Sequence, residues 1–173
     1  MKVDFEVPPK TRAELEGYAD ALRRAFGQED PFLDVVSILE RGFSGIGTRL
    51  TFRIATRNEA GPRMGYVDPM QRTLNIREDV YEGLIKNVNF DRFTVSHEIG
   101  HGLLHTATMN RMVSPGAVPA YRSAEWQADN FAGALLMPRR LVDPNKSVRE
   151  LAEQFGITQS AVRARLKIYG FIK

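Results

Sequence analysis

The chain has 173 residues, 43% of them hydrophobic and 26% charged, with a formal net charge of +3, which suits one globular domain with one core. It contains no cysteine, which excludes disulfides, thiolate metal ligands and a cysteine nucleophile. No apolar run approaches the roughly 18 residues of a membrane span and the charged opening does not resemble a signal peptide, so we expect a cytoplasmic protein without membrane contact.

Two amphipathic helices are predicted near the start of the chain. Thr11 and Glu14 form a capping box, and apolar residues follow at helical spacing. Asp30 and Pro31 are typical of an N-cap and a first helical position, which predicts a second helix that stops at Gly42. We expect both helices to pack on the core.

The hydrophobic pattern changes to alternation from Leu50 onwards. The segment GYVDPMQRTLNI then predicts two strands joined by a turn at Asp68 and Pro69. Together these stretches predict a small antiparallel sheet. An extended peptide could add to its edge as a further strand, although a purely structural sheet explains the pattern equally well. A short helix over residues 78–86 should follow, with Asp91 as the N-cap of the next helix.

The segment FTVSHEIGHGLLH holds all three histidines of the chain and completes the pattern HExxH. In an α-helix, His97 and His101 lie four residues apart on one face and can bind one metal ion with both imidazoles. Glu98 lies between them, where a carboxylate can act as a general base on metal-bound water without being a ligand. Chance matches to HExxH occur, but this helix is apolar on more than one side, and buried imidazoles need partners.

His105 is too far along the same helix to bind that ion. It follows His97 by eight residues, about 12 Å at 1.5 Å per residue, whereas metal–nitrogen bonds are about 2 Å long. We expect His105 to be a structural histidine. Position 107 is alanine, which excludes the metzincin pattern, so a third ligand must come from elsewhere.

A second apolar helix is predicted from Ser123, its N-cap, to Pro138. Glu125 and Asp129 lie on one face of it. We weigh a solvated Glu125 against a third metal ligand and favour the ligand, while Asp129 could accept the outer N–H of a ligand histidine. Residues 106–120, rich in proline and glycine, predict a mobile loop that forms a lip over the site.

The two motif helices resemble those of the ImmA/IrrE family of metallopeptidases. That family pairs an HExxH helix with a helix of the form ExxA(N/D)xFAxxLLMP, and here these read HEIGHGLLH and EWQADNFAGALLMP. RFTVSHE and LAEQFGITQSAVRARL also resemble the family, so the likeness runs from about residue 66 to the end and includes the two opening helices. One departure is that position 129 is Asp where the family often has Asn.

The resemblance implies a metal site, a catalytic residue and a substrate class. It implies zinc held by His97, His101 and Glu125, catalysis by Glu98, and a regulatory protein as substrate, often a repressor of stress or mobile-element genes.

The last segment, residues 139–173, has the form of a helix-turn-helix. Ser147 and Glu150 form a capping box, the chain turns at Gly156, and a helix restarts after Thr158. The segment carries eight lysines and arginines against three acidic residues, a net charge of +5, which could contact phosphates. Such helix pairs are more often packing elements, so we favour packing over DNA contact.

We therefore predict an α+β fold in which residues 1–173 form one mainly helical zinc metallopeptidase domain, with a small antiparallel sheet next to the HExxH helix. The predicted function is Glu98-assisted hydrolysis of a peptide bond in a protein such as a repressor, with manganese as the alternative to zinc. Tyr121 and Arg122 are placed to stabilise the oxyanion. The alternative function is a DNA-binding regulator with a structural metal.

Overall fold

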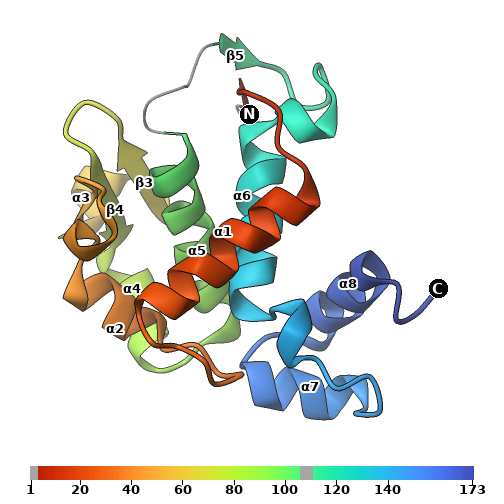
Figure 1. The fold of residues 1–173 in the computed structure, drawn as a ribbon. Helices are drawn as coiled ribbons and strands as arrows, with labels where there is room; N and C mark the ends of the chain where they lie inside the picture. Colours follow the sequence, from red (N-terminus) through yellow and green to blue (C-terminus); the bar gives the residue numbers. More distant parts are fainter. Residues whose placement is uncertain (1–3, 106–110) are drawn as a thin grey trace.

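Three helices form the centre of the molecule (Figure 1). The computed structural model describes residues 4–105 and 111–173. In it, α6 (Ala124–Leu136) packs against both α5 (Asn89–Leu104) and α1 (Arg12–Ala25), which crosses over it. A Cβ at Gly100 of α5 would lie only 3.0 Å from the Phe131 ring of α6. The glycine therefore lets the two motif helices approach closely.

A three-stranded sheet lies beside α5, as the sequence predicted, but it is mixed. β3 (Gly65–Asp68) and β4 (Thr73–Arg77) form the expected antiparallel hairpin. β2 (Thr51–Ala55) pairs with β4 in parallel, so the prediction of a wholly antiparallel sheet is corrected. The strand order is β2-β4-β3, because the chain crosses through α3 (Arg57–Ala60) from one edge of the sheet to the other.

A second, two-stranded sheet joins the start of the chain to the predicted loop. β1 (Asp4–Glu6) pairs antiparallel with β5 (Arg111–Val113). Part of the segment expected to be a mobile loop is thus a strand, and a short 3-10 helix, η2 (Ala120–Arg122), follows. Residues 114–119 between these two elements form turns without a helix or strand, and residues 106–110 lie outside the described part of the chain.

Two predicted helix starts are shifted in the structure. α2 (Val35–Arg41) begins after Asp34, whose side chain accepts the Ser37 N–H, and not after Asp30. α5 begins at Asn89, two residues before the predicted cap Asp91. The remaining predicted caps of α1, α6, α7 and α8 are present.

The C-terminal helices are tied to the rest of the protein by a buried arginine. α7 (Val148–Phe155) and α8 (Gln159–Tyr169) are joined by a turn at Gly156, which has a left-handed conformation. The Arg92 side chain of α5 donates to the carbonyl oxygens of Gly156 and Phe155 in that turn. One hydrophobic core runs from α1 to α8, so both helices share the core of the motif helices.

The remaining elements are short. They are η1 (Ser44–Ile46), α4 (Glu78–Ile85), which packs against α5, and η3 (Arg139–Leu141), which follows α6. Among the described residues, we find no helix with the length and apolarity that crossing a membrane requires.

Candidate metal centre

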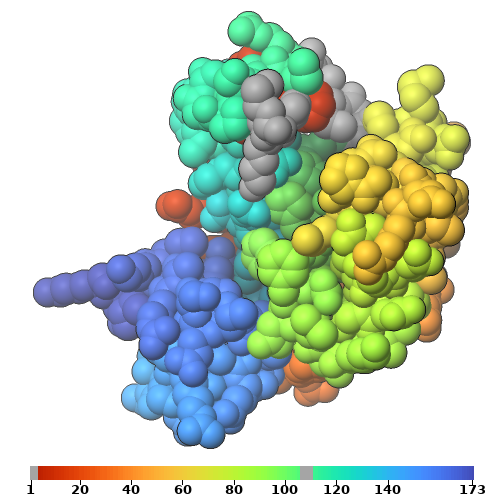
Figure 2. Space-filling view, turned by 180° about the vertical axis from the view of Figure 1, so that it is seen from behind, coloured from red at the N-terminus to blue at the C-terminus, as the bar shows by residue number. Residues whose placement is uncertain are grey.

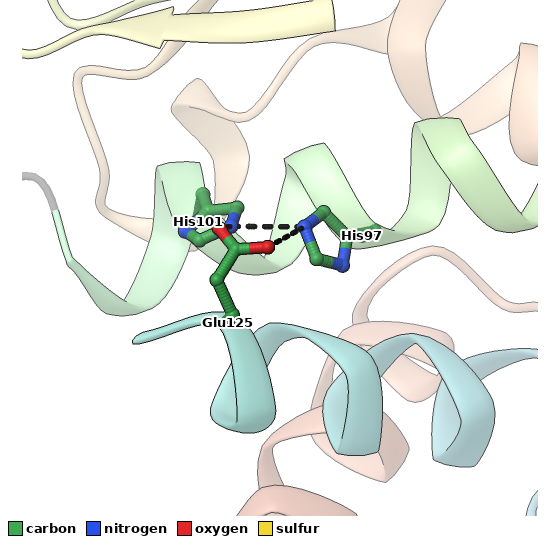
Figure 3. A group of neighbouring side chains, drawn as sticks. All are labelled: His97, His101 and Glu125. Atoms are coloured by element: carbon green, nitrogen blue, oxygen red, sulfur yellow. Dashed lines mark hydrogen bonds and ion pairs between the residues drawn. The ribbon is translucent and has the colours of Figure 1, made fainter. Parts of the chain in front are cut away.

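The HExxH helix presents two imidazoles to one point. His97 and His101 lie one turn apart on α5, and their Nε2 atoms are 2.9 Å from each other (Figure 3). Both side chains are mostly buried, with 16% and 13% of their surfaces exposed. α5, which carries both histidines, lies at the floor of a hollow between α6 and the sheet (Figure 2).

Glu125, in the first turn of α6, completes a group of three ligand atoms. Its carboxylate oxygens lie 3.1 Å from His101 Nε2 and 3.7 Å from His97 Nε2. Bonds of about 2.0–2.1 Å in tetrahedral geometry would place neighbouring ligand atoms about 3.3 Å apart. The three distances, which involve both carboxylate oxygens of Glu125, lie on either side of that value. Two imidazoles and a carboxylate with converging lone pairs are a donor set that fits a divalent metal ion.

Glu98 lies beside this group and packs against the sheet. A Cβ at Gly65 of β3 would lie 2.7 Å from Glu98 Cγ, so the glycine leaves the space that the side chain occupies. Burial raises the pKa of Glu98, and the neighbouring histidines partly oppose that shift. Glu98 is therefore a carboxylate whose environment favours taking up a proton, at the edge of the candidate metal site.

Comparison with known proteins places these residues in a family. Residues 86–167 match peptidase family M78, described as the IrrE N-terminal-like domain, and this range contains both motif helices and the complete cluster. This segment belongs to the IrrE-like family. The resemblance that the two motifs indicated is thus confirmed, and with it membership of a metallopeptidase family.

The fold of the chain also occurs in a solved structure. A Mycobacterium tuberculosis transcriptional regulator superposes with a TM-score of 0.60 at 16% sequence identity, over 90% of this chain. The chain spans only 46% of that protein's length. The similarity shows a shared fold. None of the curated proteins matches the chain significantly.

Each candidate ligand of the IrrE-like domain is held by a partner behind it. Asp129 Oδ1 lies 2.8 Å from His97 Nδ1, the contact that the helical spacing predicted. Burial lowers the pKa of His97, but the hydrogen bond and charge of Asp129 raise it overall. Ser123 caps α6, and Asp4 of β1 accepts the backbone N–H of Glu125 at 3.2 Å.

His101 has a neutral, buried partner instead of an acid. His105 Nδ1 lies 3.0 Å from His101 Nδ1, and His105 Nε2 lies 3.1 Å from Gln127 Oε1. Burial lowers the pKa of His105 to about 4, with His101 acting in the same direction, so the ring is neutral at pH 7. His105 is structural, as the sequence predicted, but its contact is with a candidate ligand.

The two predicted oxyanion donors lie in different environments. The Arg122 guanidinium pairs with Glu6 of β1 at 3.0 Å. Tyr121 is half exposed on η2. Sequence reasoning did not identify Arg63, whose charge acts on Glu98 and whose guanidinium stacks on the Tyr66 ring at 3.9 Å. No motif marks that position. Gln127 was also missed, although it lies between Glu125 and Asp129 in the second motif.

Proposed function

We propose that the protein is a zinc endopeptidase that cleaves a regulatory protein such as a transcriptional repressor. The observation that carries the proposal is the convergence of His97, His101 and Glu125 at one point, with Glu98 beside them. Zinc is proposed over manganese because two imidazoles and one carboxylate form the ligand set of many catalytic zinc sites. The repressor as substrate rests on the resemblance of the two motifs to the ImmA/IrrE family.

In this proposal, the metal ligands, the general base and the oxyanion donor are different residues. A zinc ion held by His97, His101 and Glu125 would polarise a water molecule and the peptide carbonyl. Glu98 takes a proton from that water and delivers it to the leaving amine. Its raised pKa suits this exchange, because a base works best when its pKa approaches the working pH. Tyr121 would donate to the oxyanion, since Arg122 is paired with Glu6.

The position of β3 supports an extended peptide as the substrate. β3 is an edge strand that pairs only with β4 among the described residues, and its Gly65 lies against Glu98. A peptide that adds to this edge as a further strand would pass close to the proposed base.

The decisive experiment compares wild type with Glu98→Gln. Both proteins are incubated with the cell's proteome, and new protein termini are identified. We expect about one zinc per chain in both and a loss of cleavage on the order of a hundredfold or more in Glu98→Gln. His101→Ala, as the metal control, should lose the zinc. Unchanged cleavage by Glu98→Gln would contradict the proposed base.

A further inference from the structure

A buried hydrogen-bonded chain runs from a candidate ligand to the backbone. It starts at His101, passes through His105 at the end of α5 and reaches Gln127 of α6. The Gln127 amide nitrogen then lies 2.9 Å from the Pro8 carbonyl oxygen and 2.8 Å from the Tyr121 carbonyl oxygen. His105 is 1% exposed and Gln127 is fully buried, so water does not compete for these bonds.

The two backbone carbonyls determine the position of each proton in this series of hydrogen bonds. Carbonyl oxygens only accept, so the Gln127 amide must point its NH₂ at them and its Oε1 at His105. His105 must then donate from Nε2, which leaves a lone pair on Nδ1. That lone pair accepts the proton of His101 Nδ1. The Nε2 atom of a neutral His101 is therefore left unprotonated and faces Glu125.

We propose that His105 and Gln127 are positioning residues that hold His101 in the tautomer and orientation that bind the metal. The inference rests on the metal centre of the proposed function, but not on proteolysis. A ligand histidine needs an outer acceptor at its second nitrogen, and here the acceptor is a neutral imidazole whose own direction is fixed by Gln127. His97 has the acidic Asp129 in the same place, so the two ligands are held by chemically different partners.

Zinc affinity of matched variants, measured by competition with a chelator, tests the proposal. His105→Leu removes the acceptor and should weaken zinc binding by about tenfold to a hundredfold. His105→Asn places a carbonyl oxygen near the position of Nδ1 and should retain most of the affinity. Gln127→Met frees the His105 ring to turn, and its zinc affinity should lie between those of the two His105 variants. Thermal unfolding of the metal-free proteins separates loss of folding from loss of zinc.

A second measurement reads the proton positions directly. In zinc-loaded wild type, nitrogen chemical shifts should show the His105 proton on Nε2 and the His101 proton on Nδ1. A His105 proton on Nδ1 would overturn the proposal. Equal zinc affinity in wild type and His105→Leu would do the same, and so would equal losses in the Leu and Asn variants.

The outcomes distinguish this inference from the proposed function. If wild type binds zinc with the expected protonation but no proteome cleavage depends on Glu98, the positioning role stands and the endopeptidase proposal fails. If cleavage depends on Glu98 while His105→Leu binds zinc as wild type does, the positioning role fails and the endopeptidase stands. If wild type binds no zinc, both fail.

Discussion

The position of the Glu98 side chain depends on a glycine of the neighbouring sheet. Gly65 is on β3, and the space above its Cα is filled by Glu98 Cγ. A methyl group there would meet that carbon at 2.7 Å and Ile76 Cδ1 at 3.1 Å, so one of the two must move. Glu98 is only partly buried, whereas Ile76 is buried in the core, so we expect Glu98 to move.

Gly65→Ala should therefore reduce catalysis without removing the metal. A displacement of about 1 Å at a reacting group can reduce the rate about a hundredfold, so we expect at least a tenfold loss of Glu98-dependent cleavage. Zinc content should match wild type, because Glu98 is not among the proposed ligands. Cleavage rates and metal analysis of the same preparation check both points.

Gly17→Ala is the matched control. Gly17 lies on the exposed face of α1, and nothing lies within 4 Å of an added Cβ. Alanine in a helix is favoured over glycine by about 0.5–1 kcal/mol, so unfolding should become less favourable by about that amount. Cleavage should not change. Wild-type cleavage by Gly65→Ala would show that the contact with Glu98 has no catalytic consequence.

At the scale of elements, the N-terminal strand holds the start of the Glu125 helix. Asp4 of β1 accepts the Ser123 hydroxyl at 2.6 Å and the backbone N–H of Glu125 at 3.2 Å. It is almost fully buried, with 4% of its surface exposed. The strand that carries Asp4 thus fixes the turn of α6 from which the proposed third ligand projects.

Asp4→Ala should weaken both folding and metal binding. The substitution removes the buried charged acceptor of the Ser123 hydroxyl and the Glu125 N–H. This loss should lower the free energy of unfolding by about 1.5–3 kcal/mol. Zinc affinity should fall several-fold, because Glu125 loses an anchor. Denaturant unfolding and chelator competition measure the two effects.

Asp68→Ala provides the comparison for that prediction. Asp68 also accepts two N–H groups, those of Met70 and Gln71, but in the exposed β3–β4 turn. Asp68→Ala should lower the free energy of unfolding slightly and leave zinc affinity unchanged. Equal zinc affinity in Asp4→Ala and Asp68→Ala would contradict a role of β1 in holding the site.

The elements also show what the sequence could and could not predict. Local signals were sufficient where the cause is local, as at the capping boxes of α1 and α7. They failed for β1 and β5, because strands of three residues have no readable period and their partners lie far apart in the chain. At α5 the predicted cap Asp91 packs over Gly83, a contact with another helix that no local pattern contains.

The same distinction holds for the candidate site. The HExxH spacing fixes His97, Glu98 and His101 on one helix, so their arrangement could be predicted. The place of Asp129 followed from helical spacing once α6 was assumed to pack on α5. The contact of Glu98 with Gly65 and the link from His105 to Gln127 could not be predicted, since they depend on how separate elements pack.

At the scale of the whole molecule, α8 faces the rest of the protein. Its residues Ala164 and Ile168 line a groove of about 470 Å³ together with Phe93 of α5 and Asp129 of α6. Arg165 is 5% exposed and donates to the Tyr169 hydroxyl, so it is not available to a nucleic acid. Only part of the basic charge counted in residues 139–173 therefore lies on a surface that DNA could reach.

This arrangement predicts weak binding to duplex DNA. Arg163 and Lys167 are the exposed basic residues of α8, and neutralising both as Arg163→Ser/Lys167→Ser tests a DNA-binding role. We expect wild type to bind duplex no more tightly than the non-specific range of about 10⁻⁴–10⁻⁶ M at physiological salt. The double variant should change that affinity by a few-fold at most.

Arg24→Ser/Lys86→Ser is the control, because it removes the same charge from exposed positions outside α8. It shows whether a change in DNA affinity comes from the α8 surface or from the net charge of the protein. If α8 is a packing element, the two double variants should shift the weak affinity equally, because only the total charge changes. If α8 reads DNA, the wild type should bind one sequence at submicromolar concentration, and only the α8 variant should lose that selectivity. The second result would favour a DNA-binding regulator with a structural metal over the endopeptidase.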